Sequence, residues 1–360
     1  MVTDTMSDRD LTAFAKTMRK LGRGVAQITG SMDKAEVIAR ESGRPVIWNA
    51  LIADGARNQH GGPSIQMDVA LDRLRKYNEE EGLRIYAQAL THNFASQFTL
   101  ENYNLADDIP IWKEAMAGFD MEAKKKKLAD PVRRKAFKEL HEERGGLFGG
   151  GYLLTSIKVA WIPLDVPNGL ELQNEYEGYT IGEISERENK HPIDVFLDLS
   201  LAGDLGTGFE TELLETPPES MKRLLHAPVT LPGVSDGGAH TKFVTTGRYP
   251  TELLAEWVRK HGIMTLEEAH WRLSTFPAMA AGLKNRGWIA QGMPADIIVY
   301  DYDEIDSLPC ERAWDYPAGE WRLIQKAKGY EHILVNGVET FTDGECTEAT
   351  PGMLLRHGSA

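Results

Sequence analysis

The first 90 residues alternate between segments with one apolar face and short runs that are apolar throughout. Helical spacing of the apolar residues predicts three helices, over residues 8–21, 33–41 and 67–80. The apolar runs that follow each of them predict three strands, over residues 24–29, 45–51 and 84–90. Helices and strands that alternate with short links predict right-handed crossovers and a parallel sheet. Continuously apolar strands further predict that both faces of this sheet are covered.

Residues 95–222 interrupt this rhythm and are interpreted as an insertion. Within it, residues 156–164 predict a strand and residues 179–188 and 192–203 predict two helices. The lysine run at 124–127 is interpreted as a solvated helix face. The glycine-rich segment GGLFGGGY is interpreted as a flexible loop, because it lacks the Lys-Ser/Thr ending of a phosphate-binding loop.

The alternating pattern resumes after the insertion and then changes character. Residues 229–240 predict a strand that runs into a polar glycine turn, and residues 250–262 predict a helix. Thr265 and Glu268 have the spacing of a capping box that opens a further helix. From about residue 288 the chain has short strands and turns, one of them at Asp343-Gly344. We therefore divide the chain into an α/β body, 1–287, and a C-terminal β module, 288–360.

Composition narrows the class of protein. The chain has 360 residues, of which 42% are hydrophobic and 26% are charged, a balance that is ordinary for a globular protein. Its formal net charge of −14 argues against a nucleic-acid partner, because nucleic-acid-binding proteins present a basic surface. No stretch reaches the roughly 18–20 apolar residues of a membrane span. The polar, acidic start lacks the pattern of a signal peptide. Two cysteines are too few for a disulfide framework, so a cytoplasmic setting is expected.

The strongest candidate for chemistry is the segment Ser235-Asp236-Gly237-Gly238-Ala239-His240, which ends a predicted strand. In parallel α/β folds, ligands bind beyond the carboxyl ends of the strands. Asp236 at such an end can hold a metal or accept a proton from a metal-bound water, and His240 is a second candidate ligand. Ser235, Gly237 and Gly238 would shape the loop around a substrate. In the alternative interpretation, Asp236 caps the next turn and His240 is an ordinary polar loop residue.

Other strand ends carry weaker candidates. Gln88 and His92 lie at the end of the third predicted strand and are expected to line the same mouth as Asp236. His60 lies in a glycine-rich loop. Lone histidines of this kind more often form hydrogen bonds in loops than bind metals. The sequence contains no H-x-H and no H-E-x-x-H motif, although a metal-activated water normally needs about three protein ligands.

Several segments resemble the amidohydrolase superfamily, and within it the D-aminoacylase (N-acyl-D-amino-acid deacylase) branch. The resemblance is carried by segments that together cover most of residues 176–356. They are YEGYTIGEISERENKHPIDVFLDL (176–199), GVSDGGAH (233–240) with the helical segment that follows, NRGWIAQGMPADIIVYDYDEI (285–305) and HILVNGVETFTDGECTEATPGMLLR (332–356). Residues 8–90 match the family in their alternation of predicted helices and strands more than in sequence motifs.

The resemblance implies a distorted TIM barrel with a small appended β-sandwich. It also implies one or two divalent metal ions at the strand ends, usually zinc, and a small-molecule substrate whose amide or related C–N bond is hydrolysed. The family's aspartate after the last barrel strand acts as general base toward the metal-bound water, and this role falls to Asp236.

The sequence also departs from the family. The H-x-H motif of the first barrel strand is absent, and the two middle strands end near Thr29 and Ala50, where the branch has histidines. About four barrel strands precede the β module, although closure needs eight. We therefore expect an incomplete barrel and a fragment or truncated reading frame, with an open sheet edge that favours association with a second copy.

Two hypotheses for the function remain open. The first is a metal-dependent hydrolase of amide-type bonds with Asp236 in proton transfer. The second is a truncated or metal-free homologue that keeps the fold as a scaffold or remnant, in which the metal is absent.

Overall fold

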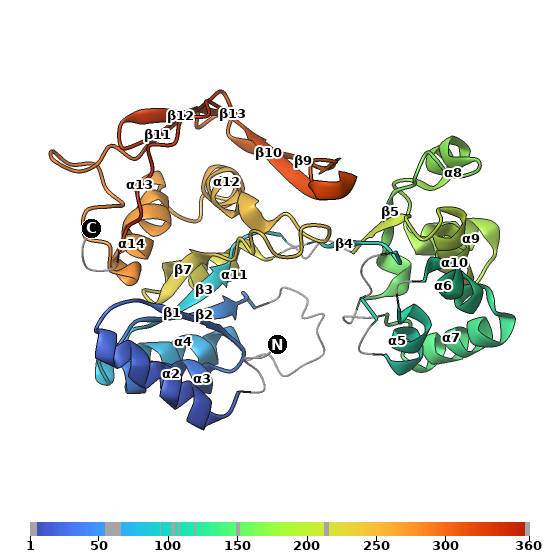
Figure 1. The fold of residues 1–360 in the computed structure, drawn as a ribbon, viewed down its shortest axis with the longest axis horizontal. Helices are drawn as coiled ribbons and strands as arrows, with labels where there is room; N and C mark the ends of the chain where they lie inside the picture. The colour runs from blue at the N-terminus through green and yellow to red at the C-terminus, as the bar shows by residue number, and fades with distance from the viewer. Residues whose placement is uncertain are drawn as a thin grey trace.

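The computed structural model describes residues 6–54, 66–93, 95–101, 105–106, 109–118, 120–148, 152–211 and 216–356 (Figure 1). Its elements fall into three regions, which are a parallel sheet with its helices, an inserted helical region and a C-terminal group of antiparallel strands (Figure 1). The molecule is thus mixed α/β, with a sheet-rich C-terminal part. Within the described ranges, no helix is both long and apolar enough to cross a membrane.

Four parallel strands form the sheet, in the order β1 (Ala26–Thr29), β2 (Val46–Leu51), β3 (Ile85–Leu90) and β7 (Thr230–Gly233). The helices α2 (Asp8–Leu21), α3 (Met32–Ser42) and α4 (Met67–Arg75) accompany the first three strands. These helices and strands match the elements predicted over residues 8–90, because their apolar periodicity is strong and local. The described residues form four parallel strands, and the sequence predicted about four barrel strands ahead of the β module.

The two faces of this sheet are buried to different degrees. Val46, Trp48, Ile85 and Ala87 point to one face and belong to the core shared with the helices. The alternate residues point to the other face, where Gln27 is exposed and Tyr86 is only half-buried. A part of that face packs on α14 (Phe276–Ala281). The prediction that both faces are covered is therefore wrong for the described residues, because alternate strand positions share one face and only one of the two carries a full helical layer.

The insertion has a core of its own. Its strands β4 (Gln97–Phe98), β6 (Gly208–Glu210) and β5 (Lys158–Trp161) form a three-stranded antiparallel sheet. Helices of the described part of the insertion lie beside it (Figure 1); they are α5 (Pro110–Met116), α6 (Met121–Ala129), α7 (Pro131–Glu143), α8 (Gly169–Tyr176), α9 (Ile181–Glu188) and α10 (Pro192–Ala202). Their buried aromatic rings stack closely, with 4.0 Å between the centroids of Trp112 and Phe137. Large aromatic side chains in contact bury much of the apolar surface that stabilises such a region.

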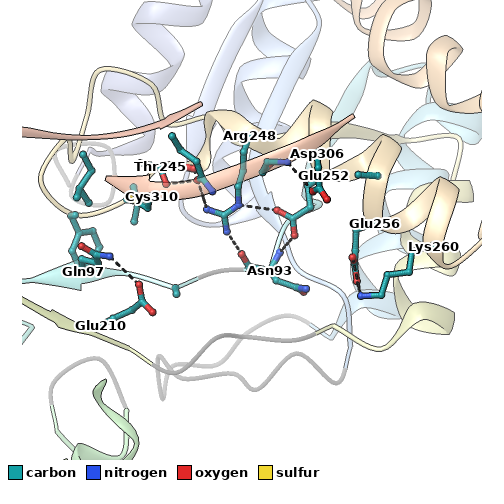
Figure 2. Close-up of a pocket in the computed structure, with 17 residues that line it drawn as sticks. Asn93, Gln97, Glu210, Thr245, Arg248, Glu252, Glu256, Lys260, Asp306 and Cys310 are labelled. Carbon is teal, nitrogen blue, oxygen red and sulfur yellow. Dashed lines mark hydrogen bonds and ion pairs between the residues drawn. The ribbon is translucent and has the colours of Figure 1, made fainter. Parts of the chain in front are cut away.

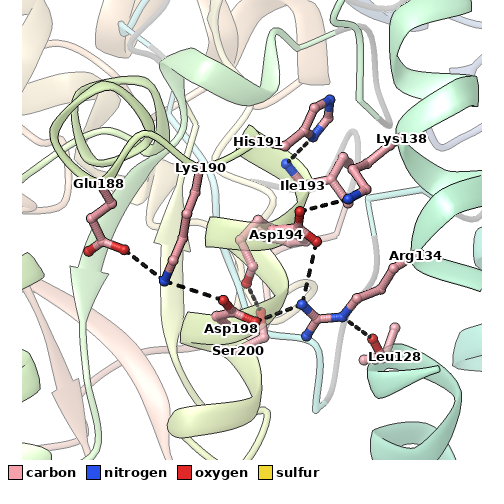
Figure 3. Close-up of polar contacts among 11 residues, drawn as sticks. Leu128, Arg134, Lys138, Glu188, Lys190, His191, Ile193, Asp194, Asp198 and Ser200 are labelled. Carbon is pink, nitrogen blue, oxygen red and sulfur yellow. Dashed lines mark hydrogen bonds and ion pairs between the residues drawn. The ribbon is translucent and has the colours of Figure 1, made fainter. Parts of the chain in front are cut away.

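Charged side chains connect the helices of the insertion (Figure 3). Asp194 on α10 accepts a hydrogen bond from Lys138 on α7 at 2.8 Å, and the neighbouring Asp198 accepts one from Arg134 at 2.7 Å. The predicted solvated lysine face is wrong for Lys124, which is buried and donates to the carbonyl of Glu101 at 3.2 Å. Residues 149–151 of the predicted glycine-rich loop lie outside the described residues.

The C-terminal region contains a sheet and a hairpin. The strands β8 (Ile297–Tyr300), β11 (Tyr330–Val335), β12 (Val338–Thr342) and β13 (Glu345–Cys346) form the antiparallel sheet, and β9 (Asp306–Ala313) pairs with β10 (Arg322–Lys328). The predicted turn is confirmed, since Asp343 and Gly344 both have positive φ, at 49° and 81°.

The helices that follow β7 agree with the prediction in outline. The helix predicted over residues 250–262 begins one residue earlier, as α12 (Tyr249–Glu252), and continues as a wider π-type helix from Leu253 to Lys260. At α13 (Leu266–His270) the hydroxyl of Thr265 accepts the Glu268 backbone N–H at 3.2 Å, as expected for a helix cap. The carboxylate of Glu268 instead accepts from Arg272 at 3.1 Å, so only half of the predicted capping box forms.

Candidate active site

The carboxyl ends of β3 and β7 lie side by side. The two strands run parallel, and Leu90 at the end of β3 pairs with Gly233 at the end of β7. The segments that leave these ends carry His92 on one side and Asp236 on the other. The structure thus brings the two strand ends that the sequence selected to the same edge of the sheet, where parallel α/β folds bind their ligands.

Asp236 and His240 face each other in the loop after β7. Asp236 Oδ2 lies 3.7 Å from His240 Nε2, and each side chain is about half exposed, at 46% and 52%. Both residues have positive φ, 45° and 52°, a conformation that Asp and His adopt more readily than most non-glycine residues. The loop is fixed at its start, because the Ser235 carbonyl accepts a hydrogen bond from the Thr246 hydroxyl. The carboxylate is therefore accessible to solvent on an anchored turn.

Gln88 lies on β3 against the end of β7. Its side-chain oxygen accepts a hydrogen bond from Gln27 at 3.1 Å, and the side chain fills the space beside Gly233. A Cβ at Gly233 would lie 2.3 Å from Gln88 Nε2 and 2.7 Å from its Cγ. Gly233 is thus required for the close approach of the Gln88 side chain to the strand from which the Asp236 loop begins.

Replacing Gly233 by alanine is expected to lower the free energy of unfolding by about 1–3 kcal/mol, because Gln88 must leave its position. The double variant G233A/Q88A should recover most of this loss, since neighbouring substitutions are not additive. Equilibrium urea denaturation measures both effects. Gly237→Ala serves as the matched control, because its Cβ would meet only Ser235 Oγ at 3.6 Å. A G233A protein as stable as the control would contradict the assignment.

His92 is buried at the carboxyl end of β3. Its exposed fraction is 1%, and burial, assisted by the positive charge of Arg248, lowers the pKa of its imidazole to about 3. The ring therefore stays neutral at neutral pH. The sequence predicted that this histidine lines the opening of the site. In the structure it lies at the predicted strand end, but its side chain is buried and not exposed to solvent.

The donor atoms present do not complete a metal site. Among the residues that the structure describes, no group of three or more His, Cys, Asp or Glu side chains gathers where a metal could bind. Asp236 and His240 provide two donor side chains. On β1 and β2, Thr29 and Ala50 occupy the positions where the resemblance implies histidines, and neither has a ring nitrogen that could bind a metal. His60 lies outside the described residues. A metal-activated water needs about three protein ligands, so the described residues do not fit a metal of this kind.

A cavity of about 490 Å³ lies beside the segment that follows the loop of Asp236 and His240, and neither of these two residues is among those that line it (Figure 2). Asn93, which follows His92, lines it from the β3 side. Phe243 lines it from the other loop, and its backbone N–H donates to the His240 carbonyl at 2.7 Å. Strands β9 and β10 contribute Cys310 and Gln325. The cavity thus lies between the strand ends and the C-terminal hairpin.

Arg248 joins the segments around this cavity (Figure 2). Its guanidinium donates to Glu252 Oε2 at 2.8 Å, to Gln325 Oε1 at 3.1 Å and to the carbonyl of Asn93. Glu252 in turn accepts the Asn93 backbone N–H at 2.8 Å, and burial raises the pKa of its carboxyl group. No sequence motif had indicated this network. Arg248 lies just before the helix predicted over residues 250–262, so its four-residue spacing from Glu252 was not recognised as a helical pair.

Comparison with known proteins agrees with the sequence pattern. Residues 192–346 match the model of the Amidohydrolase family. An N-acyl-D-glutamate deacylase from Alcaligenes xylosoxydans xylosoxydans is 35% identical over 111 residues, 31% of this chain and 20% of the relative. A D-aminoacylase from the same organism is 25% identical over 189 residues, 52% of this chain and 35% of the relative. The chain resembles the D-aminoacylase-like amidohydrolases.

The fold agrees with that of solved amidohydrolases of this branch. A crystal structure of D-aminoacylase superposes with a TM-score of 0.51 at 17% identity, over 95% of this chain and 58% of that protein. A second D-aminoacylase structure of similar TM-score concerns the binuclear metal center of that enzyme. The chain spans about a fifth to a third of the length of these two curated amidohydrolase relatives, and 58% of the first D-aminoacylase structure.

Proposed function

We propose that this chain carries part of the active site of a hydrolase that cleaves amide C–N bonds. The observation that supports this most is the placement of Asp236, an accessible carboxylate in the loop that leaves the carboxyl end of β7, beside the end of β3. The match of residues 192–346 to the Amidohydrolase family and the two deacylase relatives indicate the bond type. We further propose that the four parallel strands are part of a TIM-type barrel, and that residues 288–360 form its appended β module.

In this proposal, Asp236 moves the proton that hydrolysis requires. Its carboxylate accepts a proton from the water that attacks the amide carbonyl carbon, and returns that proton to the amine nitrogen as the C–N bond breaks. His240, 3.7 Å away, orients the carboxylate. Gln88 and the loop of Ser235, Gly237 and Gly238 hold the strand end and the turn in place. A small-molecule substrate would enter from the cavity that Asn93 and Phe243 line.

A second candidate function is a metal-free, non-catalytic homologue that keeps the fold. The binuclear metal center that one D-aminoacylase structure concerns is an argument for the divalent metal, usually zinc, that the family resemblance implies. However, the described residues offer only the pair Asp236 and His240, and Thr29 and Ala50 stand on the neighbouring strands. This shortage of donors favours the second candidate, and we assign no step of the reaction to a metal.

Amine release from a panel of N-acyl amino acids of both hands distinguishes the two candidates. The purified chain should release free amino acid above the rate of the uncatalysed reaction, in buffer or with added zinc, and the same preparation should be analysed for bound metal. Release by the folded protein supports the hydrolase. A folded chain without bound metal that releases no amine under either condition rejects the hydrolase for this chain and supports the non-catalytic homologue.

A further inference from the structure

Arg312 lies where the C-terminal hairpin meets the insertion, next to the wall of the cavity. On β9 it stands two residues after Cys310, and across the hairpin it pairs with Leu323. Residues two apart on a strand share one face, and so do directly opposed residues of an antiparallel pair. Cys310 and Leu323 both line the cavity of about 490 Å³. The Arg312 side chain therefore leaves the hairpin on the face that forms this wall.

Two indole rings pack against the Arg312 guanidinium. Its central carbon lies 3.1 Å from the ring centre of Trp161, at the end of β5, and 3.9 Å from that of Trp321, just before β10. Gly208 on β6 permits this approach, because a Cβ there would collide with the Trp161 indole nitrogen and lie 2.8 Å from Arg312 Nη2. The insertion and the hairpin thus meet around one positive charge.

The donors gathered at this place lack acceptors in the described part of the chain. Arg312 Nε and Nη1 are buried and form no hydrogen bond with any described residue, and the same holds for Trp161 Nε1. Burial lowers the pKa of the guanidinium to about 9, and the charge of Glu101 opposes this shift, so the side chain keeps its charge at neutral pH. Buried N–H groups normally find an acceptor, and a buried charge without one is strongly destabilising. Three such donors side by side indicate a missing acceptor.

Other arginines near the cavity do have carboxylate partners. Arg248 donates to Glu252 at 2.8 Å. Arg322, on the same hairpin as Arg312, donates twice to Asp315, at 2.8 and 2.7 Å. The unpaired state of Arg312 is therefore a property of its site and not of arginines in this region.

The charges around Arg312 favour a ligand with a single negative charge. Lys242 lies 4.9 Å from the ring centre of Trp321, although it also forms an ion pair with Glu320. Glu210, two residues after Gly208, accepts a hydrogen bond from the Gln97 amide at 3.0 Å instead of pairing with Arg312. These carboxylates would repel a polyanion more strongly than a monoanion.

We propose that Arg312 and the indole N–H of Trp161 bind the carboxylate group of a small ligand whose apolar part lies in the adjoining cavity. Guanidinium N–H groups form strong, charge-assisted hydrogen bonds with carboxylate oxygens. Phe243, Val244 and Leu323 would contact the apolar part. Beside two packed rings, a flat carboxylate needs less room than a tetrahedral oxyanion. This binding site goes beyond the proposed function, and its test requires no turnover.

Calorimetric titration of the full chain with three probes tests the site. Hexanoate should bind at least about tenfold more tightly than 2-heptanone, in which a methyl group replaces one carboxylate oxygen, because the ketone cannot pair with the guanidinium charge. Hexanesulfonate, a tetrahedral anion of the same charge, should bind more weakly than hexanoate. Equal binding of hexanoate and 2-heptanone overturns the proposal. Tighter binding of hexanesulfonate than of hexanoate overturns the assignment to carboxylates.

Substitutions of Arg312 locate the site. Arg312→Gln should reduce the preference for hexanoate over 2-heptanone to less than about twofold and leave 2-heptanone binding unchanged, provided that circular dichroism shows an intact fold. Arg312→Lys should keep only part of the preference, because lysine retains the charge without the planar set of N–H groups. Arg322→Gln is the matched control on the same hairpin and should bind hexanoate as the wild type does. A folded Arg312→Gln protein with the wild-type preference shows that the proposal is wrong.

Trp161→Phe provides a test that does not depend on the folding of the Arg312 variants. It keeps an aromatic ring against the guanidinium and removes the indole N–H donor. Hexanoate should then bind about two- to fivefold more weakly, and 2-heptanone as before. Unchanged hexanoate binding by the folded variant removes Trp161 from the site and contradicts the proposal.

The outcomes also separate this inference from the proposed function. Hexanoate binding through Arg312 by a chain that releases no amine upholds the carboxylate site and rejects the hydrolase. Amine release by a chain that does not prefer hexanoate to 2-heptanone does the reverse.

Discussion

Replacement of Asp236 by asparagine is expected to lower kcat for amide hydrolysis by about 10²–10⁴-fold, the range typical for the loss of a general acid-base group. Asparagine has nearly the same shape but cannot accept the proton of the attacking water at neutral pH. KM should change little, because the substrate contacts assigned above lie elsewhere. The free energy of unfolding should stay within about 0.5 kcal/mol of the wild type, since the side chain is about half exposed.

Steady-state rates of the wild type, D236N and a control measure this effect. Asp165→Asn removes an exposed carboxylate in the insertion and should retain the wild-type rate. A folded D236N protein with more than half of the wild-type kcat would show that Asp236 does not transfer the proton. The assignment of the active site to the β7 loop would then be wrong.

Acidification from pH 7 to pH 4 is expected to lower the free energy of unfolding by about 3 kcal/mol through His92 alone. Burial lowers the pKa of this imidazole to about 3, whereas an unfolded chain has the ordinary value of 6.5. Between these two values the unfolded state binds more protons than the folded state. The stability that His92 confers by staying neutral is therefore fully present above about pH 6.5, and is lost as the pH falls toward 3.

Urea denaturation of the wild type and of His92→Gln at pH 7, 5.5 and 4 measures this contribution. Glutamine stays neutral at every pH, so the variant should lose about 3 kcal/mol less than the wild type over this range. His332→Gln, which replaces a half-exposed histidine, is the control and should keep the wild-type dependence. Parallel curves for the wild type and His92→Gln would show that His92 is protonated in the folded protein.

Local patterns were sufficient for the helices and strands of residues 8–90 and for the turn at Asp343-Gly344. Each of these depends on spacing or on a residue pair within one short segment. The same reasoning placed Asp236 at a strand end, because the strand and the glycine turn adjoin in sequence. The roles of Asp236, His240 and the loop glycines remain predictions.

Features that depend on distant segments could not be obtained in this way. His92 is buried, and the carbonyl of the neighbouring Thr91 accepts a hydrogen bond at 2.5 Å from Trp257, which lies 166 positions further along the chain. The contact between Arg248 and Asn93 spans 155 positions in sequence. The lining of the cavity likewise comes from segments that only the tertiary fold brings together. No periodicity in one segment carries information about such pairs.

The place where the insertion joins the body has an evolutionary consequence. The chain enters the insertion through β4 and leaves through β6, and Gln97 pairs with Glu210 across these two strands. The same two residues form part of the cavity wall (Figure 2). Evolutionary changes in the inserted helices can therefore alter one wall of the cavity without changing the turn that carries Asp236. Ligand preference and proton transfer can then diverge under separate selection.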